Sequence, residues 1–203
     1  MHIKTLTVGP IEENCYVVSD EKTRECAVID PGDEAGRILD YIEDEKLTVR
    51  CILLTHAHFD HVGAVAEIMD ETGCELYMNA KDNGVCIGSG EEAYSAPEGT
   101  KFYSDGDKIS VGELLFRVIE TPGHTPGSVC LICGDAMFTG DTLFRDSCGR
   151  TDFAAGNSDD MMASLRRLAR LPGNFEVFPG HMFSTSLDRE RRYNYFMAMA
   201  ARE

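Results

Sequence analysis

The sequence has few basic residues. Lysine and arginine number 19, against 35 aspartates and glutamates, so the formal net charge of the 203-residue chain is -16. A polyanion would be repelled by this average field, which argues against nucleic acid and anionic membranes as partners. Bound divalent metals would make a local site much more positive, so a small anionic substrate stays compatible with the composition.

Long hydrophobic runs are also absent. No segment is long enough to span a bilayer, and the opening MHIKTLTVGP contains no apolar signal region. The eight cysteines include one CxxC pair, Cys130 and Cys133, and no CxxC…CxxC array. These two, with Cys26 and Cys51, lie in apolar, strand-like runs where a free cysteine behaves as a small hydrophobic residue. We therefore expect core thiols in a reducing compartment and a cytoplasmic protein.

The apolar patterns predict two successive series of strands and helices. The first has one helix capped by Asp33 and ending near Glu45, another over 63–72, and strands at 2–8, 14–19, 25–29, 49–55 and 75–78. The second has a helix over 159–171, a last helix from Leu187 to the end, and strands at 108–109, 114–120, 128–133, 136–139 and 175–178. Between the two series, residues 81–99 predict a flexible excursion.

This order predicts an α/β fold in which two sheets pack together and helices cover both outer faces. The two series repeat the order of strands and helices only, because no sequence repeat is visible. No linker separates independent parts, so we expect residues 1–203 to form a single domain with two pseudo-symmetric halves, about 1–105 and 106–203.

A dense group of potential metal ligands follows the predicted buried strand at 49–55. Four of them stand within six residues in the segment THAHFDH at 55–61, in a chain with six histidines. Because a strand end pins this loop, we expect His56 and His58 to project together and Asp60 and His61 to point to a second position. Neutral imidazole and carboxylate suit zinc, iron or manganese. An incidental polar surface loop is the alternative interpretation.

Three later segments repeat this situation. Each follows a predicted strand, and in each a glycine precedes the ligand candidate, which allows a tight turn and close backbone approach. The segments are TPGHTPG at 121–127, TGDT at 139–142 and FPGH at 178–181, with His124, Asp141 and His181 as candidates. Five of the six histidines therefore stand at strand ends, which predicts a metal site. The sixth, His2, lies on the first strand, and we expect no metal role for it.

The same segments resemble the metallo-β-lactamase superfamily. The matching motifs are THAHFDH at 55–61, PGHT at 122–125, TGDT at 139–142 and PGH at 179–181. Within that superfamily, the chain resembles the short bacterial hydrolases similar to type II glyoxalase (hydroxyacylglutathione hydrolase), through GDTLF at 140–144, GRTDF at 149–153, Ser184-Thr185 and ERRYN at 190–194. The resemblance covers nearly the whole chain and implies a four-layer αββα sandwich.

The resemblance also implies a site for two divalent metal ions, zinc in the first place, with iron or manganese as alternatives. One ion would be held by His56, His58 and His124, the second by Asp60, His61 and His181, and Asp141 would bridge them. A bridging carboxylate screens two dications about 3.5–4 Å apart, and a water shared between them is acidified into a hydroxide nucleophile. That hydroxide would attack a carbonyl carbon, so Asp60 and Asp141 would be catalytic as metal ligands and no serine or cysteine nucleophile is required.

Arg150 and Asp152 allow two interpretations. In one, Arg150 contacts an anionic substrate; in the other, the pair braces the loop behind Asp141, which we favour because most such pairs hold geometry. Phe144 is expected either to line the substrate pocket or to belong to the core. The charged residues at 190–192 are expected to form a solvated face of the last helix.

Other branches of the superfamily fit the sequence less well. β-Lactamases of the commonest class place a cysteine at the second metal and lack a histidine corresponding to His61. The nucleases carry a large extra domain or an RNA-binding arm, for which neither the length nor the charge of this chain leaves room. Full-length type II glyoxalases add a helical domain that grips glutathione with basic residues. The chain stops short of such a domain, so we expect weak binding of glutathione thioesters or a preference for another thioester.

The nearest competing function is that of the persulfide dioxygenases, which use one iron and oxygen and share the segment CGRTDF at 148–153. Two details favour a hydrolase: PGH at 179–181, where that branch has Pro-Ala-His, and Ser128 in the HTPGS pattern. We therefore expect hydrolysis of a small thioester such as S-lactoylglutathione. A lactonase and a non-catalytic binding protein are the further alternatives, and the substrate, native metal and oligomeric state are left open by the sequence.

Overall fold

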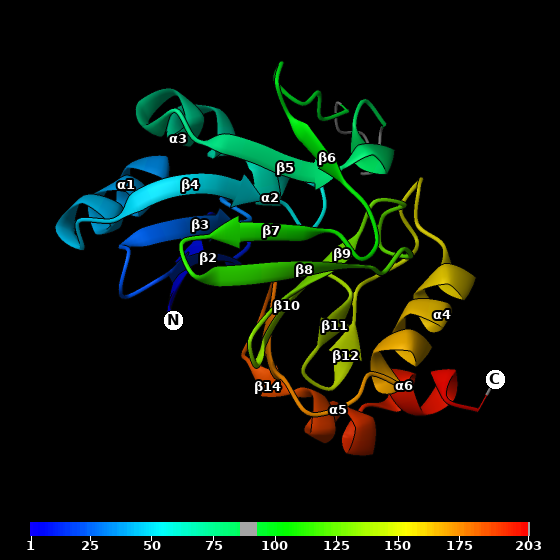
Figure 1. Ribbon diagram of the computed structural model, residues 1–203. Coiled ribbons are helices and arrows are strands. Elements are labelled where there is room, and N and C mark those ends of the chain that lie inside the picture. The colour runs from blue at the N-terminus through cyan, green and yellow to red at the C-terminus, as the bar shows by residue number, and fades with distance from the viewer. Residues whose placement is uncertain (86–92, 203) are drawn as a thin grey trace.

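Two six-stranded sheets form the centre of the protein in the computed structural model, which describes residues 1–85 and 93–202 (Figure 1). The first sheet contains, in spatial order, β1 (His2–Val8), β2 (Glu13–Ser19), β3 (Glu25–Ile29), β4 (Thr48–Leu53), β5 (Glu75–Asn79) and β6 (Lys101–Tyr103). The second contains, in spatial order, β14 (Thr185–Ser186), β13 (Glu176–Pro179), β10 (Ala136–Gly140), β9 (Val129–Cys133), β8 (Leu114–Glu120) and β7 (Lys108–Val111). A separate short hairpin is formed by β11 (Leu143–Phe144) and β12 (Ser147–Cys148).

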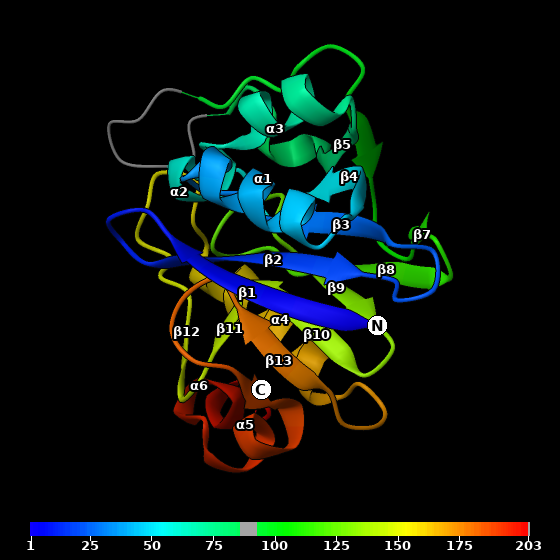
Figure 2. The same cartoon turned by 90° about the vertical axis from the view of Figure 1, so that its left-hand side faces the viewer.

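Helices cover the outer face of each sheet, as Figures 1 and 2 show. The first sheet packs against α1 (Ala35–Asp44), α2 (Phe59–Val62) and α3 (Val65–Thr72). The second packs against α4 (Ser158–Ala169), α5 (Leu187–Tyr193) and α6 (Tyr195–Ala200). A 3-10 turn, η1 (Ala80–Asp82), follows β5. The predicted four-layer αββα sandwich is confirmed.

Three apolar clusters separate the four layers, and strand periodicity explains them. Along β2, Cys15 and Val17 face the helices of the first sheet, while Tyr16 and Val18 face the other sheet. Along β9, every residue is buried because Val129 and its alternate neighbours pack between the sheets and the others pack under α4. A strand buried on both faces has to be a continuous apolar run, as the sequence shows at these positions.

The cysteines belong to these clusters, as expected. Among the described residues, all are free thiols; Cys148 is partly exposed, and the buried ones are Cys15, Cys26, Cys51, Cys74, Cys130 and Cys133. Cys86 lies outside the described residues. Within the described ranges, no helix has both the length and the apolar character needed to cross a membrane.

The carboxyl ends of several strands point to one edge of the sandwich, and this edge positions the site. In the first sheet β3, β4 and β5 are parallel neighbours. In the second, β10 and β13 are parallel, and β8 runs the same way because both β8 and β10 are antiparallel to β9. Loops that follow parallel strands meet at one edge, where ligands of α/β proteins commonly bind.

Several details differ from the sequence-based expectations. The strands β6, β11, β12 and β14 were not predicted. The expected last helix is interrupted at Asn194, whose extended backbone ends α5 and whose side chain accepts hydrogen bonds from the first N–H groups of α6. The predicted cap by Asp33 is wrong, because Glu34 stands at the N-cap of α1 and Asp33 accepts the N–H of Glu34 instead. Residues 86–92 of the expected flexible excursion lie outside the described residues.

Candidate metal centre

Four loops carry the seven candidate ligands. They follow β4, β8, β10 and β13 at the edge where these strands end. The loop after β4 continues into α2, and together they supply four candidates; each other loop supplies one. In chain order the candidates are His56, His58, Asp60, His61, His124, Asp141 and His181. They form two groups with Asp141 between them.

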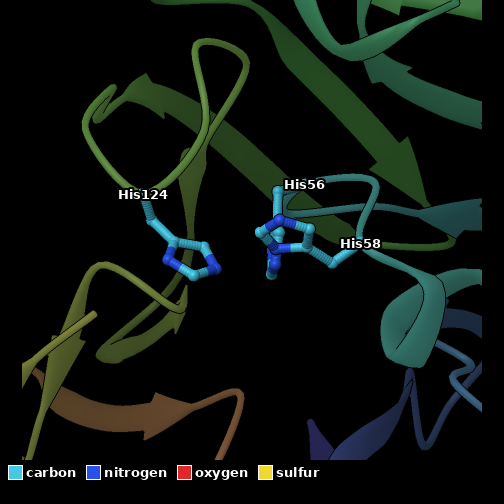
Figure 3. A group of neighbouring side chains, drawn as sticks. All are labelled: His56, His58 and His124. Carbon is cyan, nitrogen blue, oxygen red and sulfur yellow. The ribbon is translucent and has the colours of Figure 1, made fainter. Parts of the chain in front are cut away.

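The first group consists of His56, His58 and His124, all buried. One nitrogen of each ring lies within 4.8 Å of the others, and the three rings are in edge contact. Figure 3 shows His124 approaching the other two from a separate loop. Burial, together with the neighbouring imidazoles, lowers the pKa of His56 well below its ordinary value, so this ring is neutral, the form that binds metals.

The second group consists of Asp60, His61 and His181, whose ligand atoms also lie within 4.8 Å of one another. Nε2 of His181 is 3.1 Å from Oδ2 of Asp60. Burial alone would raise the pKa of Asp60, but this hydrogen bond and the nearby His61 hold it at about 2. Asp141 contacts both groups, because its Oδ1 is 3.5 Å from His61 Nε2 and its Oδ2 is 3.4 Å from His124 Nε2.

Several inward-facing atoms have no hydrogen-bond partner within the described part of the chain. They are shielded from solvent and include His56 Nε2, His61 Nε2, His124 Nε2 and Asp141 Oδ1. Buried polar atoms are normally paired, since an unpaired one costs about 1–3 kcal/mol. Imidazole nitrogens and carboxylate oxygens converging in this way fit divalent ions such as zinc, iron or manganese. The donor set thus fits the two metal ions that the resemblance implies.

Asp30 orients two of these histidines. It is buried directly after β3, with a backbone φ of 48°. Its carboxylate accepts hydrogen bonds from the N–H (2.7 Å) and hydroxyl (2.5 Å) of Thr55 and lies 3.0 Å from His61 Nδ1. Thr55 Oγ1 is 3.1 Å from His56 Nδ1, so both rings are held at Nδ1 and each Nε2 is directed inward. Burial alone would lower the pKa of His61, yet the bond to Asp30 and the surrounding carboxylates raise it.

The segment after β12 supports His124 and forms one wall of the site. The backbone carbonyl of Arg150 lies 2.7 Å from His124 Nδ1, which holds that ring in the same way. The Arg150 side chain makes a bidentate ion pair with Asp152, at 2.6 and 2.7 Å, and lies 4.2 Å from the centre of the Phe153 ring. The pair predicted from the sequence is therefore present. Both of its side chains are more than half exposed, so its energetic contribution is small.

Two of the predicted glycine positions are explained by close contacts. Gly140 has φ +45°, a left-handed conformation, and a Cβ there would collide with Thr55 Oγ1. A Cβ at Gly180 would collide with Asp141 Oδ1 and lie 2.7 Å from His61 Cε1. Only glycine allows the loops after β10 and β13 to approach the ligands this closely.

A cleft of about 390 Å³ opens over the two groups, a volume suited to a small molecule. Apart from the candidate ligands, it is lined by Ile11, Phe59, Phe144, Ser147, Cys148, Arg150, Phe153 and Met182. Phe144 is 7% exposed and its ring centroid is 6.3 Å from that of His181. Phe144 thus belongs both to the core and to the wall of the cleft. The two alternatives expected from the sequence therefore both apply.

Comparison with known proteins identifies the family. Residues 8–181 match the metallo-beta-lactamase superfamily. The chain belongs to the metallo-β-lactamase superfamily. One relative within it is hydroxyacylglutathione hydrolase GloC of Haemophilus influenzae, which is 34% identical over 209 residues, 97% of this chain and 98% of that protein. Membership places the chain among metallo-hydrolases.

Solved structures that share this fold include proteins with different names. The BLEG-1 B3 metallo-beta-lactamase has a TM-score of 0.88 and 32% identity, covering 97% of this chain and 99% of that one. A di-iron-bound form of TTHA1623 has a TM-score of 0.84 and 36% identity, covering 95% and 99%. ETHE1 from Myxococcus xanthus has a TM-score of 0.82 and 30% identity, covering 99% and 90%. The shared fold therefore leaves the reaction to be argued from the site.

Asp82 is a buried carboxylate of this metallo-β-lactamase domain that the sequence interpretation missed. Its Oδ2 accepts hydrogen bonds from the Ala57 N–H (3.2 Å) and the Thr125 hydroxyl (2.8 Å), and its Oδ1 accepts the Gly127 N–H at 2.6 Å. Burial raises the pKa of Asp82, although these hydrogen bonds oppose the shift. Asp82 thus ties the loop after β4 to the loop that carries His124, and so joins two sources of the first ligand group.

Glu13 is a second missed carboxylate. It is 1% exposed at the start of β2, and its Oε1 lies 3.7 Å from His61 Nδ1, on the opposite side of the ring from the metal site. Burial raises the pKa of Glu13 well above its ordinary value. Two successive glutamates before an apolar strand, Glu12 and Glu13, give no sequence signal that one of them is buried.

Glu190 contradicts the expected solvated face of the last helix. It is fully buried and accepts hydrogen bonds from the Asp146 N–H (2.8 Å), the Thr185 hydroxyl (2.6 Å) and Asn194 Nδ2 (3.0 Å). The expectation was wrong for this residue because α5 packs beneath the β11–β12 hairpin. Glu190 fastens that hairpin, and with it Phe144 in the cleft wall, to the C-terminal helices.

Proposed function

We propose that the protein is a dinuclear metal-dependent hydrolase of small thioesters, with S-lactoylglutathione as the reference substrate. One observation carries the proposal: two ligand groups meet at Asp141, and four of the atoms that converge there are buried without hydrogen-bond partners among the described residues. They are His56 Nε2, His61 Nε2, His124 Nε2 and Asp141 Oδ1. Two divalent ions bound there would supply Lewis acidity and an acidified water for hydrolysis.

Each candidate ligand has a proposed role. His56, His58 and His124 would hold the first ion, Asp60, His61 and His181 the second, and Asp141 would contact both. Zinc is the first choice of metal, with iron and manganese as alternatives, because the donors suit all three. The similarity to a di-iron-bound structure supports retaining iron among them.

The residues around the ligands would bind the substrate and exclude water. Phe144 and Phe153 give the cleft apolar walls, which exclude water from the reacting bond. The ion pair with Asp152 uses Nε and Nη2 of Arg150, so Nη1 is the atom that would contact an anionic group of the substrate. Backbone contact between Arg150 and His124 places this cation beside the first ligand group.

The similarity to a hydroxyacylglutathione hydrolase supports a thioester as the substrate class. The aligned region covers 98% of that relative, so the similarity spans nearly all of a hydroxyacylglutathione hydrolase of comparable length. The buried free thiols support a reducing compartment, and we place the activity in the cytoplasm on that ground. The net charge supports a small-molecule partner in preference to nucleic acid or an anionic membrane.

Hydrolysis of S-lactoylglutathione by zinc-reconstituted protein tests this proposal. We expect turnover that a chelator abolishes, that zinc restores and that His56→Ala lacks. The exposed His2→Ala is the matched control and should retain wild-type activity, since His2 belongs to none of the ligand groups found among the described residues. Metal-independent turnover, or equal loss in both variants, would contradict the proposed site.

A persulfide dioxygenase is the second candidate, supported by the overall similarity to ETHE1. The two activities differ in metal and in co-substrate, because oxygen is consumed only in the dioxygenase reaction. Oxygen uptake by iron-loaded protein with glutathione persulfide, without thioester hydrolysis, would favour this candidate. Turnover of a lactone without either activity would favour a lactonase, and inactivity in all three assays with unchanged stability after chelation would indicate a binding protein.

A further inference from the structure

A second hollow adjoins the metal cleft. It is a groove of about 820 Å³, and it shares Ile11, His181 and Met182 with the cleft. A molecule whose reacting bond lay at the ligand groups would therefore extend into this groove past His181.

The groove exists because an edge strand extends beyond the facing sheet. β1 is the edge of the first sheet, and Ile3, Thr5 and Thr7 share the strand face that looks toward the second sheet. The second sheet ends there in β14, which is only two residues long, so Thr5 and Thr7 are left exposed. Figure 2 shows β1 and β13 on this side of the molecule. Tyr16, paired with Thr5, forms part of the floor.

Three exposed apolar side chains line the groove, beside the polar side chains of Thr5, Thr7 and Ser184. Ile11 is 48% exposed, Met182 58% and Phe183 78%, although large apolar side chains are usually covered in a folded protein. Among the described residues that line the groove, Glu12 is the one with a formal charge, apart from the titratable His181. A groove lined by exposed apolar side chains, uncharged polar groups and a single acidic side chain disfavours carboxylates and favours an uncharged chain.

The wall shared by groove and cleft is held in a fixed conformation. Met182 has φ +67°, a left-handed backbone conformation that is strained for a residue with a Cβ. Asn14 Nδ2 donates to the Met182 carbonyl at 2.9 Å, and the Asn14 N–H donates to the Gly180 carbonyl at 2.7 Å. Thr7 Oγ1 donates to Asn14 Oδ1 at 3.1 Å. These bonds fasten the loop after β13 to β1 and β2, so the groove is part of the folded structure.

Charge separates the two ends of the cleft. Arg150 lies beside His124, at the first ligand group, whereas the groove begins at His181, in the second group. We propose that the groove binds the uncharged acyl chain of the substrate and that the thiol part, with its polar groups, lies at the Arg150 end. The inference rests on the proposed thioesterase function and extends the substrate class to acyl chains longer than lactoyl.

Chain-length dependence of hydrolysis tests this inference. The probes are acetyl, butyryl and hexanoyl thioesters of N-acetylcysteamine, a neutral thiol, with S-lactoylglutathione as the reference. We expect kcat/KM of the metal-reconstituted protein to rise about two- to fourfold for each added methylene, which is the effect of transferring one methylene to an apolar surface.

Two variants locate the effect. Thr5→Arg places a long charged side chain in the groove at an exposed position, and Phe183→Ser removes one of its exposed apolar side chains. Both should flatten the dependence on chain length while acetyl-thioester turnover stays within about twofold of wild type. Thr48→Arg, an exposed threonine on β4 away from the groove, is the matched control and should keep the wild-type dependence.

The outcomes separate this inference from the proposed function. A flat chain-length series in the wild type, or a rise that both groove variants retain, would overturn the groove assignment while leaving a thioesterase. The absence of turnover with every thioester would instead overturn the proposed function on which the inference rests.

Discussion

Removal of the Asp82 carboxylate should weaken both the fold and the first ligand group. In Asp82→Ala three buried donors lose their acceptor: two backbone N–H groups and the Thr125 hydroxyl. The hydroxyl can still turn to Ser128 Oγ at 2.8 Å, which leaves two N–H groups unpaired. At about 1–3 kcal/mol for each buried unpaired donor, the variant should lose about 2–6 kcal/mol of unfolding free energy.

The metal affinity should fall as well, because Asp82 fixes ligand positions. It bonds the N–H of Ala57, which stands between His56 and His58, and the side chain of the residue that follows His124. Loss of such an outer carboxylate typically weakens metal binding about 10–100-fold. Asp82→Asn keeps one acceptor oxygen and should show a smaller loss in both measurements.

Two assays separate these effects. Urea unfolding of chelated protein gives the stability change without the contribution of bound metal, and competition with a chromophoric chelator gives the zinc affinity. Asp107→Ala is the control, since Asp107 accepts one exposed N–H and belongs to none of the ligand groups found among the described residues, and it should change stability by less than about 1 kcal/mol. Wild-type stability or unaltered zinc affinity in Asp82→Ala would refute the reasoning.

Three further changes have defined outcomes. Gly180→Ala should lower the rate of hydrolysis at least about 100-fold with little loss of expression, because the added Cβ would displace Asp141. Activity near that of the wild type would contradict the described close packing. Glu190→Gln should lower the unfolding free energy by about 1–3 kcal/mol in urea titrations, because one of its buried acceptors becomes a donor, and an unchanged midpoint would contradict its bracing role. In chelated protein, burial alone would lower the pKa of His181, but its hydrogen bond to Asp60 and the nearby carboxylates raise it. The stabilisation from this shift is fully present below the ordinary pKa of about 6.5 and is lost as the pH rises through the folded value. His181→Ala should therefore destabilise the chelated protein more at pH 6 than at pH 8, and an equal effect at both pH values would oppose this assignment.

The sequence predicted the layers well, because long buried strands have a strong signal. The runs at β2, β4, β8 and β9 are continuous or alternating apolar segments, and each lies where the pattern indicates. β11, β12 and β14 were missed because two residues are too few to show a period of two. The break between α5 and α6 was missed because Asn194 is followed by a further apolar helical pattern, and only its side-chain bonds to α6 identify it as a cap.

Ligand candidates were easier to predict than the residues that orient them. Histidines are rare in this chain, so their concentration after strands is informative. Asp30 and Asp82 belong instead to the commonest charged class in the sequence, and their partners are 25–45 positions away along the chain. The available signal for Asp30 was its position directly after an apolar strand. The motif DPGD at 30–33 instead suggested an ordinary turn. Glu190 was misplaced because helix periodicity does not show that a hairpin will cover one face.

The activity of metal-free protein titrated with zinc tests the central claim most directly. The rate of thioester hydrolysis should rise with added zinc and reach a plateau at two equivalents per chain, because both ligand groups are needed. Asp141→Ala, which removes the carboxylate that contacts both groups, should stay inactive throughout the titration while keeping a cooperative unfolding transition. A plateau at one equivalent, or turnover by Asp141→Ala, would contradict a dinuclear site.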